Sequence, residues 1–383
     1  MQRAIARPLA FMASLCLLAG LTACSAERSS AKTQPAADGS AASAPADAAP
    51  GSKLVGISMP TKSLERWSRD GEHLVKELEA LGYDTTLQFA DNKVEQQISQ
   101  IQNMINEGPA VLVVGSIDGS ALVPVLDQAA AAGIKVIAYD RLIRDSEAVD
   151  YYATFDNYQV GKLQGEYIVK TLDLANNKGP FNLEPFSGSP DDNNAKFFFA
   201  GAWDQLSPYV ESGVLVVPSG KAPKSVDDWQ SIGIQAWMAP AAQAEMETRL
   251  NSFYQDKKVQ AVLAPNDALA LGITQALESA GYSATDLPVI TGQDADLANV
   301  QNIINGKQTM TVWKDTRKLG TQVAKMVDQI VKGEEVTVND TKSYENGKKV
   351  VPSFLIEPQV VTKDNVKELL VDSGYYQAEE LGL

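Results

Sequence analysis

The sequence contains very little histidine and cysteine. Its 383 residues include one histidine, His73, and two cysteines, Cys16 and Cys24. His73 lies between charged residues in a helical pattern, which favours a solvated helix face over a role as a ligand. A zinc site or a Ser-His-Asp triad requires at least one functional histidine or several cysteines, so both kinds of site are effectively excluded.

Motifs of the common enzyme classes are also missing. The sequence has no G-x-S-x-G elbow, Walker phosphate loop, G-x-G-x-x-G fingerprint or H-E-x-x-H pair. We therefore expect no metal, no cofactor and no enzymatic activity. A glycosidase remains an alternative, because that reaction needs only two suitably spaced acids, for which Asp140 and Asp294 are the candidates.

The N-terminal apolar run is too short to cross a membrane as a helix. It extends from Leu9 to Gly20 behind Arg3 and Arg7, which is typical of a secretory signal peptide. The residues that follow, 21 to 24, resemble the lipobox of bacterial lipoproteins. The resemblance implies that residues 1–23 are removed and that Cys24 carries lipid. The protein is then exported and anchored to the membrane, at the outer face of the plasma membrane or in the periplasm.

Residues 24–52 contain no aromatic or β-branched aliphatic side chain, so they are expected to form a disordered tether. A flexible coil of this length has a root-mean-square span of roughly 30 Å. The net charge of the chain is −15, from 33 basic and 48 acidic residues. This acidic balance argues against nucleic-acid binding, which needs clustered Lys and Arg, and it disfavours anionic ligands.

From Lys53 onward, short apolar strand patterns alternate with amphipathic helical patterns. Examples are the strand patterns Leu54 to Met59 and Lys135 to Tyr139, which flank several helical stretches. This alternation is typical of parallel sheets built from βαβ units. Because a second similar series begins near Tyr151, the sequence predicts an α/β fold with two lobes.

Polar clusters follow four of the predicted strands. They are Asp140 with Arg141, Asn266 with Asp267, Gln293 with Asp294, and Lys314 with Asp315. Open α/β sheets bind ligands at the carboxyl ends of their strands, so the clusters are expected to share a pocket. Carboxylates, amides and cations suit a sugar, whose hydroxyls both donate and accept. The alternative is that individual residues of these clusters, such as Asp267 and Asp294, only cap helices.

Six runs of the sequence resemble the xylose-binding and multiple-sugar-binding proteins of bacterial ABC importers, in the same order and at the same spacing. The runs are Lys135 to Arg141, Phe155 to Asn157, Ser189 to Lys196, Pro265 to Asp267, Gly292 to Asp296 and Thr309 to Lys314. The resemblance implies a type I periplasmic-binding-protein fold, in which three crossover segments join two doubly wound parallel-sheet lobes. The implied lobes are 53–154 with 315–351, and 155–314 with 352–383.

The same resemblance implies a set of sugar-binding residues. They are Arg66, Asp140, Arg141, Asp192, Asn194, Lys196, Trp237, Asn266, Asp294 and Lys314. Trp237 would stack on the sugar ring, and the alternative is that it is an ordinary packing residue. For Arg66, the alternative is an exposed position on the surface of a helix. Trp67 is expected to belong to the core.

The resemblance also implies a function and its partners. A monosaccharide such as xylose, glucose or galactose would be captured by hinge closure, with hinges near Phe155, Lys314 and Val351, and delivered to an ABC permease. The protein is expected to act as a monomer. A sugar-sensing receptor that reports to a membrane signalling protein is the alternative.

Overall fold

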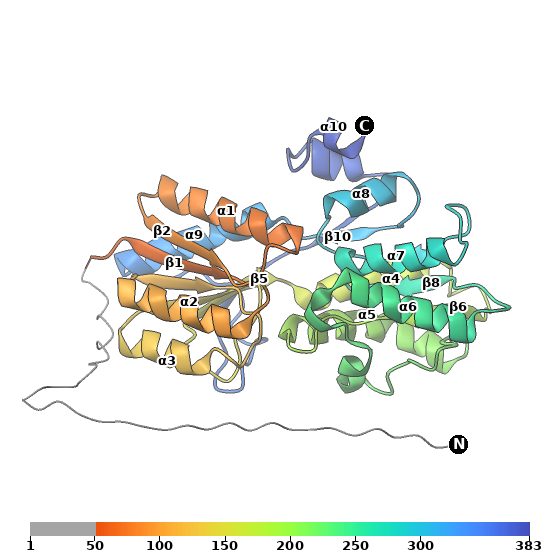
Figure 1. Ribbon diagram of the computed structural model, residues 1–383, viewed down its shortest axis with the longest axis horizontal. Helices are drawn as coiled ribbons and strands as arrows, with labels where there is room; N and C mark the ends of the chain where they lie inside the picture. Colours follow the sequence, from red (N-terminus) through yellow and green to blue (C-terminus); the bar gives the residue numbers. More distant parts are fainter. Residues whose placement is uncertain (1–50) are drawn as a thin grey trace, which may run out of the picture. The chain divides into compact units, whose positions relative to one another are not determined.

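The computed structural model describes residues 51–383, which form two α/β lobes (Figure 1). The expected signal peptide, the lipidation site Cys24 and almost all of the tether lie outside the described residues. In the described part of the chain, no helix has both the length and the apolar character needed to span a membrane.

The N-terminal lobe is built on a six-stranded parallel sheet with the order β11-β5-β4-β3-β1-β2. Its strands are β1 (Leu54–Met59), β2 (Asp84–Phe89), β3 (Val111–Val114), β4 (Lys135–Tyr139), β5 (Tyr151–Phe155) and β11 (Ser353–Ile356). The central strands β1 and β3 are buried along almost their whole length because helices cover both faces of the sheet.

The helices of this lobe bury one apolar stripe each. They are α1 (Glu65–Ala80), α2 (Val94–Glu107), α3 (Val123–Ala131) and α9 (Thr316–Lys332). Leu74 of α1 and Val323 of α9 belong to the core on one face of the sheet. Ile101 of α2 and Leu126 of α3 belong to the core on the other face. The sheet is therefore held between two helical layers.

The C-terminal lobe contains a second parallel sheet with the order β7-β6-β8-β9. Its strands are β6 (Phe181–Pro185), β7 (Leu215–Val216), β8 (Ala261–Leu263) and β9 (Val289–Ile290). Its helices are α4 (Asn157–Thr171), α5 (Asn193–Glu211), α6 (Ala239–Phe253), α7 (Asp267–Ser279) and α8 (Leu297–Ile304), with the 3-10 helices η1 (Val226–Ile232) and η2 (Gln235–Trp237).

The last part of the chain packs on this lobe. Strands β10 (Thr311–Trp313) and β12 (Gln359–Val361) form an antiparallel pair. The π-helical turn Lys367–Val371 and helix α10 (Ala378–Leu381) follow, and α10 lies beside α8 (Figure 1). A small apolar core that includes Trp313, Tyr376 and Leu381 fixes this segment.

Three segments cross between the lobes: after β5, after β10, and between β11 and β12. The third crossing differs from the prediction, which placed it near Val351. The chain stays in the N-terminal lobe through Ile356, because β11 pairs with β5 in parallel register from Ser353 to Ile356. The amide of Asp156 donates to the Ile356 carbonyl over 3.0 Å, so two of the crossings are tied together.

Close packing of α4 on α5 positions the start of α5 near the cavity between the lobes. Gly161 of α4 and Gly201 of α5 face the backbone of the partner helix, and a Cβ on either one would collide with a carbonyl oxygen there. Only glycine allows the two helix backbones to approach this closely. The α/β fold with two parallel-sheet lobes that the sequence predicts is confirmed.

Candidate ligand-binding site

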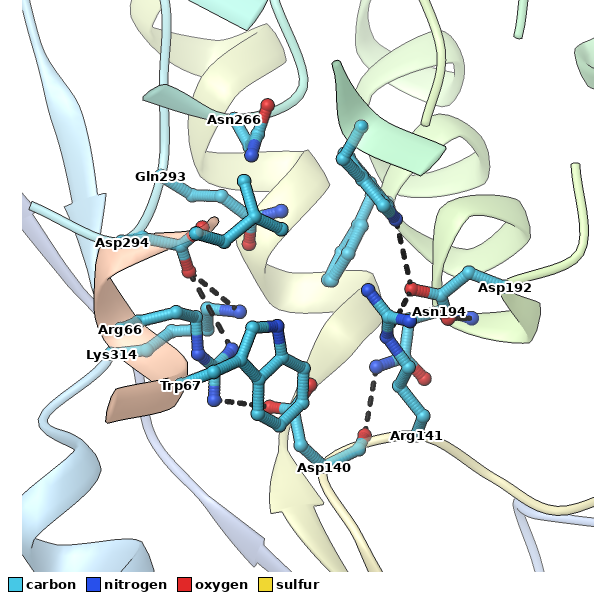
Figure 2. A pocket seen from close by; sticks show the side chains of 13 residues that line it. Arg66, Trp67, Asp140, Arg141, Asp192, Asn194, Asn266, Gln293, Asp294 and Lys314 are labelled. Carbon is cyan, nitrogen blue, oxygen red and sulfur yellow. Dashed lines mark hydrogen bonds and ion pairs between the residues drawn. The ribbon is translucent and has the colours of Figure 1, made fainter. Parts of the chain in front are cut away.

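A cavity with about 290 Å³ of empty space lies between the lobes (Figure 2). It is lined by Leu64, Arg66, Trp67, Asp140, Arg141, Asp192, Asn194, Phe198, Trp237, Asn266, Gln293, Asp294 and Lys314. These residues come from the start of α1, the end of β4, the start of α5, and loops and strand ends of the C-terminal lobe. Side chains from both lobes therefore face one shared cavity.

Arg66 holds together the carboxylates on one side of the cavity. Its guanidinium lies 2.6 Å from Asp70 and 3.0 Å from Asp140 in its own lobe. Across the cleft it lies 3.6 Å from Asp294, which also pairs with the Lys314 amino group at 3.0 Å. Figure 2 shows Arg66, Asp140, Asp294 and Lys314 converging on the cavity. The pairs bring the lobes together around the cavity.

A second ion pair, between Arg141 and Asp192, closes the opposite side. The Nε of Arg141 lies 2.8 Å from an Asp192 oxygen, and the indole N–H of Trp237 donates to the same oxygen over 3.1 Å. Arg141 also donates to the Ser116 carbonyl over 3.1 Å. Because Asp192 begins α5 in the C-terminal lobe, this pair also bridges the two lobes.

The charges that line the cavity balance. Three cationic side chains, Arg66, Arg141 and Lys314, face three carboxylates, Asp140, Asp192 and Asp294. All six side chains are less than one-tenth exposed. A net-charged ligand would leave an uncompensated buried charge here, and that is costly in free energy. The lining therefore favours an uncharged ligand with many hydrogen-bonding groups.

The electrostatic surroundings fix the ionisation of two carboxylates. Burial tends to raise the pKa of Asp140, but the positive charges of Arg66 and Lys314 outweigh it and lower that pKa below its ordinary value. Burial raises the pKa of Asp192, an effect that the nearby Arg141 only partly offsets. Asp140 therefore stays ionised at neutral pH and offers a charged acceptor to a ligand.

Three lining residues have left-handed backbone conformations. The φ angles are 62° for Asp140, 56° for Trp237 and 98° for Asp294. Side chains other than glycine adopt such angles only when the surroundings impose them. At Asp140, the carbonyl oxygen accepts hydrogen bonds from Tyr152, Thr154 and Asn194 at 2.7 to 2.8 Å.

Two tryptophan rings form apolar parts of the wall. Trp67 lies beneath the guanidinium groups of Arg66 and Arg141, at 4.5 and 5.2 Å from its ring centre. Trp237 packs edge to face on Phe198, and its ring sits where a Cβ of residue 188 would be, so Gly188 makes room for it. Flat aromatic faces suit the C–H surface of a sugar ring.

Buried polar atoms without a protein partner point to a ligand. Among the described residues, Nε of Arg66, Nε1 of Trp67 and Oε1 of Gln293 are buried and make no hydrogen bond. Buried polar groups are normally paired, so such atoms at a cavity wall are suited to bind a ligand. Two of them donate and one accepts, which fits a molecule with hydroxyl groups.

Nine of the ten predicted residues line the cavity. The exception is Lys196, which is half exposed and lines a different cavity, with its amino group 3.8 Å from Asp227. The correction has a simple cause: Asn194 faces the cavity, and two helical residues turn the next position by about 200°. Asn194 itself bonds to the Asp140 carbonyl and to the Tyr152 hydroxyl, so it also supports the wall.

Four lining residues are not among the ten sugar-binding residues that the resemblance implies. Gln293 stands next to Asp294 in a run that the resemblance covers, and Trp67 stands next to Arg66 but is assigned to the core. Trp67 has both roles, because it is 1% exposed and also lines the cavity. For Leu64 and Phe198, the sequence carries no signal beyond their apolar character.

The fold and the site define a solute-binding protein with two lobes and a small polar cleft between them. A model of the periplasmic binding protein domain matches residues 55–335. The chain belongs to the periplasmic binding protein family. This is a family of binding proteins and not of enzymes, so the glycosidase alternative is set aside.

Relatives and solved structures place the chain among sugar-binding members of this family. It is 49% identical, over 85% of its length and 92% of the other chain, to a multiple sugar-binding periplasmic receptor of Rhizobium radiobacter. It is 39% identical, over 85% and 92%, to the D-xylose-binding periplasmic protein of Escherichia coli. The resemblance seen in the sequence is therefore confirmed.

A solved structure is also similar over almost its whole length. It is an ABC transporter solute-binding protein from Clostridium phytofermentans with bound β-D-glucose. Its TM-score is 0.82 and its sequence identity 53%, covering 86% of this chain and 99% of that one. A carbohydrate transporter solute-binding protein from Chloroflexus aurantiacus, in complex with D-glucose, is 35% identical with a TM-score of 0.77, over 85% and 97%.

Proposed function

We propose that this protein captures one monosaccharide, an aldose such as glucose, galactose, arabinose or xylose, and delivers it to an ABC importer. The observation that carries the proposal is a small buried cavity in which three cations face three carboxylates beside two tryptophan rings. Such a lining can pair every hydroxyl of an uncharged sugar and cover its C–H faces. The sugar-binding relatives and the glucose-bound structures support the same conclusion.

The lining residues divide into acceptors, donors and walls. Asp140, Asp192 and Asp294 accept from sugar hydroxyls; Arg66, Arg141 and Lys314 donate; Asn266 and Gln293 can do both; Trp67 and Trp237 cover the ring. Asn194 acts mainly as support for Asp140. Lys196 has no part in sugar binding under this proposal.

Capture takes place by hinge closure about the three crossing segments. A sugar that first binds one lobe presents its remaining hydroxyls to the other, so the ligand favours the closed arrangement. The contacts of Arg66 with Asp294, and of Arg141 with Asp192, form only when the lobes meet. The ABC permease would distinguish the closed protein from the open one.

Titration calorimetry of the protein beginning at Ser25 tests the sugar-binding part of this proposal. The panel contains glucose, galactose, xylose and arabinose, with glucose 6-phosphate as a charged control and maltose as a control for size. We expect at least one neutral monosaccharide to bind and both controls to fail. Tight binding of the phosphate ester, or no binding of any neutral sugar, would refute the proposal.

We further propose that Cys24 is the lipidated first residue of the mature protein, which then remains attached to the membrane while residues 25–52 act as a tether. Incorporation of labelled palmitate in a bacterial host tests this. The variant Cys24→Ser should carry no label, and Cys16→Ser, whose changed residue is removed with the signal peptide, should be labelled like the parent. Equal labelling of both variants would contradict the assignment.

A sensory role is the second candidate function, because one relative is named a receptor. The two functions are separated by deleting the gene and measuring both sugar uptake and sugar-dependent transcription. Delivery to an importer predicts that uptake of labelled sugar is lost. Unchanged uptake with a lost transcriptional response would favour the receptor.

A further inference from the structure

A second contact between the lobes lies outside the sugar cavity. It joins the N-terminal end of α1 in the N-terminal lobe to the C-terminal segment and to the start of α8. We call it the C-terminal clasp and define it as Glu65 and Arg69 with the turn residues 295–297 and the pair Tyr375 and Tyr376. None of these residues lines the cavity.

Arg69 is the centre of the clasp. It donates to the Tyr376 hydroxyl over 2.7 Å, and its guanidinium lies 4.9 Å and 5.2 Å from the ring centres of Tyr375 and Tyr376. It is also paired with Glu65 at 3.2 Å in its own helix and lies 3.9 Å from Asp296 across the cleft. One arginine thus makes polar and cation–π contacts with the opposite lobe.

Glu65 adds two further contacts across the cleft. One of its oxygens accepts from the Leu297 amide over 3.3 Å, at the start of α8, and the other lies 3.4 Å from the Tyr376 hydroxyl. A negative charge at a helix N-terminus is favourable. The Tyr376 hydroxyl donates to the Ala295 carbonyl over 2.9 Å, which fixes its position.

The C-terminal side of the clasp is a rigid part of its lobe. Tyr376 is 5% exposed and packs in the small core with Ala295, Val300 and Leu370. Tyr375 packs edge to face on Trp313 at 5.3 Å. Because this side is held in place before the lobes meet, the clasp needs little further ordering to form.

We propose that the C-terminal clasp sets the sugar affinity of this protein by stabilising the closed arrangement without touching the sugar. This inference rests on the proposed function. Contacts that form only in the closed state raise the population of that state, and the apparent dissociation constant falls in proportion. Arg69 and Tyr376 are therefore positioning residues that act through the lobe arrangement.

Tyr376→Phe is the test variant, because it removes one hydroxyl and keeps the ring. Tyr158→Phe is the matched control: its hydroxyl also bonds to a charged side chain, Asp204 at 2.7 Å, but within the C-terminal lobe. Loss of a hydrogen bond to a charged group predicts a dissociation constant about 10 to 100 times higher for Tyr376→Phe. The control should bind like the parent.

Two results distinguish a weakened lobe closure from direct damage to the cavity. The affinity should fall by the same factor for every sugar that binds, because the clasp does not contact the ligand. Arg69→Ala should cause a similar loss, and the double variant should lose less than the product of the two single losses. A loss that differs between sugars, equal affinities of Tyr376→Phe and Tyr158→Phe, or fully multiplicative losses would overturn the proposal.

A measurement without sugar tests the clasp independently of the proposed function. The chain from Ser25 onward contains no cysteine, so spin labels at Ala130→Cys and Ser279→Cys, which are exposed positions in different lobes, report the interlobe distance alone. We expect a smaller closed fraction for Tyr376→Phe than for the parent. Identical distance distributions would refute the clasp, whereas failure of the parent to bind any sugar would refute only the proposed function.

Discussion

Replacing Asp140 with asparagine removes one charge from the cavity and changes almost nothing else. Asparagine has the same shape, and it tolerates the left-handed φ of 62° at this position better than alanine does. The hydrogen bonds to the residue 140 carbonyl do not involve its side chain. Arg66 keeps Asp70 and Asp294 as partners, so the fold should persist.

The magnitude follows from the hydrogen bond that is lost. A hydrogen bond to a charged group contributes about 1.5 to 3 kcal/mol, so the dissociation constant for the best sugar should rise about 10- to 100-fold. Titration calorimetry measures this change, and Asp127→Asn, at an exposed position on α3, is the matched control. An affinity for Asp140→Asn within twofold of the control would show that this carboxylate does not contact the sugar.

Three further predictions concern other parts of the structure. Burial and two neighbouring carboxylates raise the pKa of Asp296 from 3.8 to about 7, so its contribution to the free energy of unfolding falls as pH rises from about 4 to about 7. In urea unfolding, the free energy of unfolding of Asp296→Asn minus that of the parent should therefore increase over this pH range. A difference that does not change with pH would contradict this prediction. Gly188→Ala places a methyl group where the ring of Trp237 lies, so the sugar affinity should fall and the free energy of unfolding should decrease by about 1 to 3 kcal/mol, which a lower thermal midpoint reports. An unchanged affinity together with an unchanged midpoint would exclude that contact. Lys196→Ala should bind sugar like the parent in calorimetry, and a tenfold loss would restore this residue to the site.

Most of the candidate site could be predicted from the residues that follow the predicted strands. Because open parallel sheets gather ligands at the carboxyl ends of their strands, Asp140, Asn266, Asp294 and Lys314 were predicted to lie together, and they line one cavity. Gln293 belongs to the same predicted cluster as Asp294, although the resemblance does not include it among the sugar-binding residues. Neighbouring residues of an extended chain point to opposite sides, but the φ of 98° at Asp294 changes the chain direction, and both side chains reach the cavity.

The boundary of the third crossing was missed for a similar reason. The apolar run from Ser353 to Ile356 is only four residues long and lies between Pro352 and Pro358, so its local pattern does not reveal which sheet it joins. Pairing with β5 decides that question, and the partner is about 200 residues away in the sequence. Contacts of this kind depend on tertiary structure rather than on local preference.

The balance of buried charges has a consequence for the environment in which the protein works. At physiological ionic strength, ions in solution largely screen attractions between exposed charges that lie more than about 8 to 10 Å apart, but they screen buried pairs much less. In this cavity the ion pairs Arg66–Asp140, Arg141–Asp192 and Lys314–Asp294 are enclosed, and an uncharged ligand releases no counterions when it enters. Outside the cytoplasm, the salt concentration is set by the surroundings of the cell, and we expect the affinity for an uncharged ligand to change little between dilute and saline water.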